Sequence, residues 1–185
     1  STALFPLSAG NTRLYFSQFR FILMCHLLCL FIFLFISVNN ILLLFFFYEC
    51  LLVPSFLFVY FVSPYRRSVQ ASLYFLIWTQ IGSVLVLLGV AYLFYLSGEF
   101  SFKYIQLFNF SYIESYILFT LFFLGFGVKI PIWPFHHWLI KTHVEAPAGF
   151  SMFLSGFLVK SALFGFFKLT NLINYEINTN VFLTI

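Results

Sequence analysis

Three ionisable residues lie inside long apolar segments of this 185-residue chain, and they are its clearest sign of chemistry. Lys129 is in YILFTLFFLGFGVKIPIWPFHHW, Glu49 in ILLLFFFYECLLVPSFLFVYFV and Lys160 in SMFLSGFLVKSALFGFFKL. A charged side chain at the centre of a membrane helix costs about 2.5–3.5 kcal/mol on insertion scales. Ionisable residues inside a membrane commonly mark a proton or ion path, so we take these three as candidate catalytic residues of proton translocation.

Two prolines, Pro131 and Pro134, follow Lys129 within the same apolar segment. Proline has no backbone N–H, so it breaks a helix and frees carbonyl groups. We therefore expect the helix to break between Lys129 and Pro134 into two half-helices. A broken membrane helix with an ionisable residue at the break is typical of ion-translocating proteins.

Three histidines lie between the two lysines: His136, His137 and His143. Lysines and histidines joined by internal water can pass protons, so the three are candidate relay residues. A nearby Glu49 carboxylate would favour charged Lys129, whereas desolvation alone would favour the neutral amine. The alternatives are a structural salt bridge between Glu49 and Lys129, snorkelling of Lys160 to an interface, and interfacial or backbone-bonded histidines.

The composition predicts an integral membrane protein, because 63% of the residues are hydrophobic and only 8% are charged, against about 25% charged in soluble domains. No phosphate-binding glycine loop, CxxC pair, nucleophile elbow or nucleic-acid-type basic patch occurs. The chain is expected to form one all-α membrane domain, 1–185, with an extramembrane arm at 1–20, a five-helix bundle at 21–170 and a tail at 171–185. One helix is expected to break in the middle of the membrane.

About 20 apolar residues are needed to span a bilayer. Five segments meet this length, and the expected spans are 21–38, 41–62, 73–96, 116–138 and 148–169. Pro147 suits the first turn of the last span. The final residues, VFLTI, are interpreted as the start of a further span.

Basic residues gather at one set of segment ends: Arg13, Arg20, Arg66, Arg67 and Lys141. The opposite loop, 97–115, carries one lysine and two glutamates. The positive-inside rule therefore places the N-terminus, 63–72 and 139–147 on the inner side of the membrane.

Cys25, His26 and Cys29 share helical spacing in the first span. A fourth ligand is missing from the sequence nearby, so we expect small buried side chains rather than a metal site.

The run VKIPIWPFHHWLIKTHVEAPAGFSMFLSGFLVKSALFGFFKL (128–169) resembles the antiporter-like membrane subunits of respiratory NADH dehydrogenase, complex I. The block THVEAPAG (142–149) is similar to the chain 4 branch of that family in particular. FFYECLLVPSF (46–56) looks like the glutamate helix of the same branch, and 66–89 matches more loosely. The resemblance extends over about 41–170.

By this resemblance, Glu49 corresponds to the family's buried glutamate and Lys129 to the lysine on its broken helix. Lys160 corresponds to the lysine or relay position on the next helix, and His136 and His143 match family histidines. Ile140 and Phe150 depart from the usual proline and small residue, which affects the loop and helix packing but not the charged positions.

The resemblance implies a proton-translocating subunit of NADH:ubiquinone oxidoreductase that forms a half-channel open to the inner side. It implies no cofactor in this chain, because FMN, the iron–sulfur clusters and ubiquinone belong to the rest of the complex. Structural cardiolipin is expected near the basic inner loops of this chain. The partners would be other membrane-arm subunits. The 31 phenylalanines favour an organelle-encoded protein of the mitochondrial inner membrane over a bacterial one.

The family's subunits contain two inverted repeats, and the resemblance covers the first alone. A transport site lies between repeats, so we expect a second chain, from a split gene, to supply the remaining helices. The alternatives are a remnant, a cation/proton antiporter subunit and a structural membrane subunit that does not conduct.

Overall fold

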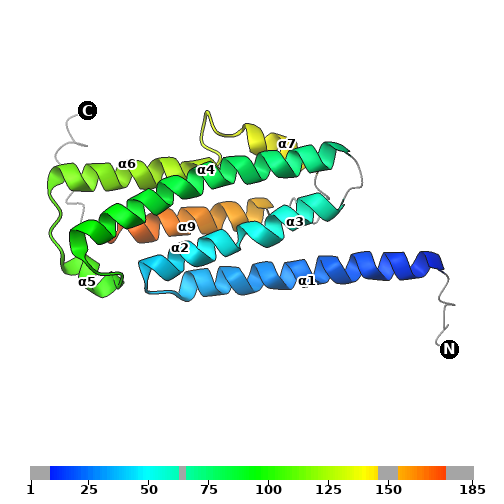
Figure 1. The fold of residues 1–185 in the computed structure, drawn as a ribbon, viewed down its shortest axis with the longest axis horizontal. Helices are drawn as coiled ribbons and strands as arrows, with labels where there is room; N and C mark the ends of the chain where they lie inside the picture. The colour runs from blue at the N-terminus through cyan, green and yellow to red at the C-terminus, as the bar shows by residue number, and fades with distance from the viewer. Residues whose placement is uncertain (1–8, 63–65, 146–153, 174–185) are drawn as a thin grey trace.

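The computed structural model describes residues 9–62, 66–145 and 154–173. Apart from one isolated bridge between Asn40 and Ser101, the regular structure of these ranges is helical. The long helices lie side by side along one direction and form an elongated bundle (Figure 1). The all-α architecture expected from the sequence is confirmed.

The first helix, α1 (Ala9–Ser37), is longer than expected. The extramembrane arm expected up to residue 20 is helical from Ala9 onward, because no proline interrupts the helix between its two ends, and its place outside the membrane stays a prediction. A short connection follows, and Asn40 starts the next helix by accepting hydrogen bonds at its side-chain oxygen from the N–H groups of Leu42 and Leu43, at 3.0 and 3.4 Å.

The segment expected as a single span at 41–62 forms two consecutive helices, α2 (Ile41–Cys50) and α3 (Leu52–Val62). The interruption at Leu51 lies three residues before Pro54, which has no N–H to donate to the carbonyl four residues earlier. The two helices together occupy the expected span and meet at Leu51, two residues after Glu49.

The next helix, α4 (Arg66–Ser97), begins seven residues before the expected span. It ends at Gly98, whose φ of 70° is the left-handed conformation that glycine adopts readily after a helix. The loop expected at 97–115 contains a short helix that the sequence did not predict, α5 (Phe102–Leu107), which buries Phe102 and Ile105.

The broken helix is confirmed: α6 (Tyr112–Lys129) ends at Lys129, and α7 (His137–Glu145) begins after the two prolines. Ser111 and Glu114 form a capping box that starts α6. Among the described residues, two helical stretches are long and apolar enough to cross a membrane by length and composition, one in α4 and one that coincides with α6.

The last described pass consists of a π-helical turn, η1 (Leu154–Leu158), and α9 (Val159–Thr170). Lys168 joins the end of α9 to the end of α1, because its ammonium donates to the carbonyls of Ile36 and Val38. Cations are favoured at helix C-termini. The expectations for Pro147 and for VFLTI lie outside the described residues.

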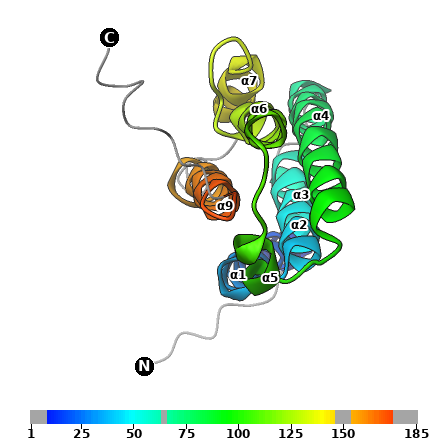
Figure 2. The same ribbon diagram turned by 90° about the vertical axis from the view of Figure 1, so that its left-hand side faces the viewer.

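The connections gather at two opposite ends of the bundle (Figure 1). The start of α1, the junction of α3 with α4, and the end of α7 lie at one end. The α1–α2 connection, α5 and the end of α9 lie at the other, where Ile41 N–H donates to the Phe100 carbonyl at 2.9 Å. This arrangement agrees with the sides expected from the positive-inside rule. Viewed along the bundle, α6 lies between α9 and α7 (Figure 2).

Candidate functional site

Lys129 is the last residue of α6 and is only 5% exposed. Its ammonium Nζ donates to the backbone carbonyl of Tyr48 at 3.2 Å and lies 3.3 Å from the centroid of the Tyr48 ring. A desolvated cation–π contact contributes about 2 kcal/mol. The charge at the helix break is therefore held by a carbonyl and a ring face that both belong to one residue of α2.

The Tyr48 ring is itself fixed by packing, with 1% of the residue exposed. The Phe126 ring meets it edge-on at 5.0 Å, and the Phe35 ring lies 6.3 Å away. Its hydroxyl is buried, and it has no hydrogen-bond partner among the residues that the structure describes. The ring, rather than the hydroxyl, makes the contact with Lys129.

Glu49 follows Tyr48 on α2 and faces α4. Its Oε2 accepts a hydrogen bond from Gln80 Nε2 at 3.3 Å, and Ser83 Oγ lies 3.1 Å from Gln80 Oε1. Within the described ranges its Oε1 is buried with no hydrogen-bond partner. Glu49 and Lys129 are brought together on neighbouring helices, yet they are held by different neutral partners.

The break after Lys129 leaves carbonyl groups that an intact helix would satisfy. Ile132 N–H donates to the Gly127 carbonyl at 3.0 Å, one residue beyond the regular helical partner. The Val128 carbonyl accepts instead from Trp138 Nε1 at 2.8 Å. A buried carbonyl left unpaired costs about 1–3 kcal/mol, so Trp138 stabilises the broken backbone beside Lys129.

Lys160 is exposed on the isolated chain and lies directly after the π-helical turn η1. Gly165 of α9 packs on the Phe126 ring of α6. Counted from that contact at 1.5 Å per residue, Lys129 lies about 4.5 Å and Lys160 about 7.5 Å toward the same end of the bundle. The two lysines are thus at similar depth, with Lys160 on a face that the described residues leave open.

The histidines lie on the α7 side of the site. The His136 and His137 rings stack at 4.6 Å. The α7 helix packs on α4, where the Trp138 and Phe75 rings are 5.3 Å apart. Because α7 and α9 lie on different sides of α6, the structure does not place α7 between the two lysines (Figure 2). The relay role of His136, His137 and His143 stays a prediction.

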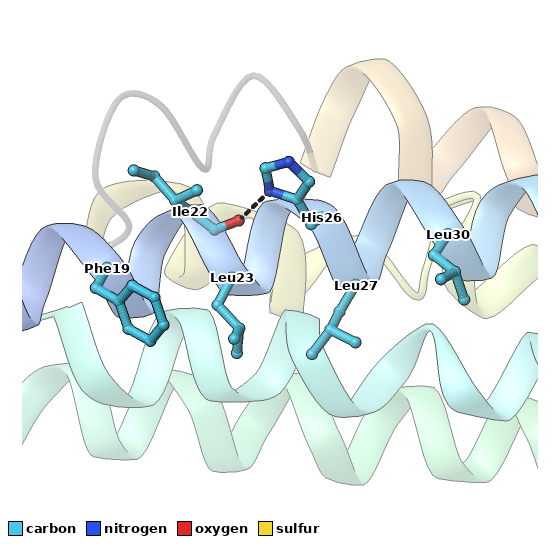
Figure 3. Close-up of a pocket in the computed structure, with 6 residues that line it drawn as sticks. All are labelled: Phe19, Ile22, Leu23, His26, Leu27 and Leu30. Atoms are coloured by element: carbon cyan, nitrogen blue, oxygen red, sulfur yellow. Dashed lines mark hydrogen bonds between the residues drawn. The ribbon is translucent and has the colours of Figure 1, made fainter.

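The cysteine and histidine residues of α1 are separate from this site. His26 Nδ1 donates to the Ile22 carbonyl at 2.8 Å, and the ring lies over an apolar groove along α1 (Figure 3). Within the described part of the chain, no group of three or more His, Cys, Asp or Glu residues is placed to hold a metal ion.

Tyr48, Gln80 and Ser83 are the site residues that the sequence alone did not single out. A tyrosine next to a glutamate in an apolar segment looks like an ordinary packing residue, and glutamine and serine carry no charge that would make them stand out. The available signal was a run of polar side chains at Thr79, Gln80 and Ser83 within the apolar α4 segment.

Comparison with known proteins assigns this arrangement to a family. Residues 38–185 match the model of the NADH:quinone oxidoreductase/Mrp antiporter transmembrane family. The NADH-ubiquinone oxidoreductase chain 4 of Paramecium tetraurelia is 50% identical over 82% of this chain and 32% of its own length. The NADH-quinone oxidoreductase subunit M of Rickettsia conorii is 38% identical over 70% of this chain and 26% of its own. The chain therefore spans about a third of the length of the curated relatives it matches or less.

Solved structures agree. A chain of respiratory complex I from Thermus thermophilus with bound NADH superposes with a TM-score of 0.67 at 27% identity, covering 79% of this chain and 32% of that one. A chain of the archaeal membrane-bound sulfane sulfur reductase shares the fold, with a TM-score of 0.71 at 22% identity over 85% of this chain and 33% of its own. The resemblance to the chain 4 branch is confirmed, and the chain belongs to the NADH:quinone oxidoreductase/Mrp antiporter transmembrane family.

Proposed function

We propose that this chain is a proton-translocating membrane-arm subunit of respiratory NADH:ubiquinone oxidoreductase. The observation that carries the proposal is Lys129, a buried lysine at the break of a membrane helix, held beside the glutamate helix without a direct ion pair to Glu49 among the described residues. A buried charge in that position is costly and is typical of a proton path. The chain would contribute no redox chemistry of its own.

In the proposed mechanism, the bundle forms a half-channel open to the inner side. Electron transfer to quinone in other subunits would change the distance between Glu49 and Lys129. Lys129 would then release its proton toward Lys160 on α9 through internal water, because the histidines at the α7 side do not lie between the two lysines (Figure 2). The similar depth of the two lysines supports this direction of transfer.

The open face around Lys160 supports a further part of the proposal, which concerns partners. We expect helices of the family fold that lie outside this sequence to cover that face, together with other membrane-arm subunits. We place the assembly in the mitochondrial inner membrane, with cardiolipin near the basic inner loops. Mass spectrometry of the purified native complex tests this, since flavin and iron–sulfur subunits should co-purify with the chain.

The decisive test of function is Lys129→Met in the assembled complex. Methionine fills a similar volume without the charge, so we expect the complex to assemble and oxidise NADH while proton pumping into vesicles falls. Lys103→Met, on the exposed surface of α5, is the matched control and should pump normally. Normal pumping by Lys129→Met would overturn the proposal and favour a structural subunit, and co-purification with membrane chains alone would favour an antiporter assembly.

A further inference from the structure

We propose that Tyr48 is a positioning residue for proton transfer, whose ring and carbonyl hold the Lys129 ammonium at the helix break while Glu49 is paired with Gln80. This inference rests on the proposed function and deepens it. It assigns a part in the proton path to Tyr48, the aromatic residue before Glu49, whose residue type alone does not suggest such a role.

Two groups of Tyr48 contact the Lys129 Nζ. Its two contacts, 3.2 Å to the Tyr48 carbonyl and 3.3 Å to the centre of the ring, both come from one residue. A ring face attracts a cation through its quadrupole, most strongly where water is excluded. Tyr48 therefore stabilises the charged ammonium in a place where the carboxylate does not.

The Tyr48 ring is held in place by its packing. The Tyr48 ring is wedged against Phe126 of α6 and Phe35 of α1, at 5.0 and 6.3 Å between ring centres. Side chains packed in this way keep one position, whereas the lysine ammonium is carried by a flexible four-carbon stem. The mobile partner of the contact is therefore the lysine.

Glu49 lies on a different side of α2 from Tyr48. It is the next residue on the same helix, about 100° further around the axis, and its carboxylate is bonded to Gln80 on α4. Tyr48 and Glu49 thus offer one ammonium two alternative partners on adjacent positions of α2. The structure shows the arrangement in which Lys129 is on Tyr48 and Glu49 is on Gln80.

The test compares two variants of Tyr48 in the assembled complex reconstituted in vesicles. Tyr48→Leu removes the ring and keeps the backbone carbonyl, and we expect roughly a fivefold loss of protons pumped per NADH oxidised. Tyr48→Phe keeps the ring and removes only the hydroxyl, which has no hydrogen-bond partner among the described residues, so it should pump almost as the wild type does. Equal losses in both variants, or no loss in Tyr48→Leu, would overturn the ring's role.

A structural effect of the smaller side chain is separated by two further measurements. Phe122→Leu truncates another fully buried aromatic residue, away from the ammonium, and should leave the pumping ratio unchanged in the complex that assembles. The drop in Tm caused by Tyr48→Leu should be at least halved in a Lys129→Met background, because the cation is then absent. An undiminished drop would mean that the ring acts only by packing.

The inference and the proposed function fail in different ways. If Lys129→Met pumps normally, the function proposed for the chain is wrong. If Lys129→Met stops pumping and Tyr48→Leu does not, the function stands and the positioning role of Tyr48 alone is wrong.

Discussion

At the scale of single residues, the site holds two opposite charges with neutral groups. A buried ion pair gains Coulomb energy but loses the hydration of both charges, and its net contribution is often small. Here a carbonyl and a ring hold Lys129, and an amide holds Glu49. Each charge keeps a partner of its own, so a change in their distance does not leave either one bare. Partner exchange of this kind suits a group that must alternate between two states.

Trp138 provides a prediction at the same scale, because its indole N–H satisfies the Val128 carbonyl that the helix break releases. Trp138→Phe should lower the free energy of unfolding by about 1–3 kcal/mol, the cost of an unpaired buried carbonyl. Thermal unfolding of the purified complex followed by loss of this subunit would measure it. Trp133→Phe, at a tryptophan that is 80% exposed, is the control. Equal Tm values for the two variants would show that the hydrogen bond contributes nothing.

At the scale of helices, the sequence predicted what charge and proline determine. Lys129 and its helix break were found because a lysine followed by two prolines in an apolar segment is rarely compatible with a continuous helix. Tyr48 and Gln80 were not found, because their part depends on which helix faces which. The span 41–62 was predicted but the position of its interruption at Leu51 was not, and α5 was missed because six residues carry too weak a pattern.

Glycines on both helices allow a close contact between α4 and α6. A Cβ added at Gly125 would lie 2.9 Å from the Gly82 carbonyl oxygen and 2.7 Å from a Val86 methyl group. Small residues let membrane helices approach closely, and this approach sets the position of Gln80 relative to the end of α6. The glycines therefore affect the geometry of the site indirectly, through the spacing of α4 and α6.

Gly125→Ala should force α4 and α6 apart, because backbone atoms cannot yield as a flexible side chain does. We expect a loss of about 1–3 kcal/mol in stability, typical of overpacking, and less assembled complex on native gels. Gly156→Ala in η1 is the matched control, since its Cβ would meet nothing within 4 Å. Normal assembly of Gly125→Ala would indicate that the two helices are not in close contact in the membrane.

At the scale of the whole molecule, the described connections lie toward the two ends of the bundle, apart from the connection between α6 and α7, which lies between those ends (Figure 1). Arg66, Arg67 and Lys141 lie toward one end, while the bridge between Asn40 and Ser101 joins the connections at the other. The site lies between them, with Lys129 reached from α2 and with Lys160 on the open side of α9. In the proposed mechanism, orientation therefore decides from which compartment Lys129 receives its proton.

Two variants, each with one added cysteine, test that orientation. Gln70→Cys places an exposed thiol near the start of α4, and Tyr104→Cys places one on α5, at the opposite end of the bundle. The positive-inside rule predicts that a membrane-impermeant maleimide added to intact mitoplasts labels position 104 and not position 70. Inverted vesicles should give the reverse pattern, and the unmodified chain measures any background from Cys25, Cys29 and Cys50. Labelling of position 70 in mitoplasts would show that the bundle has the opposite orientation. The proposed half-channel to Lys129 would then open to the outer side.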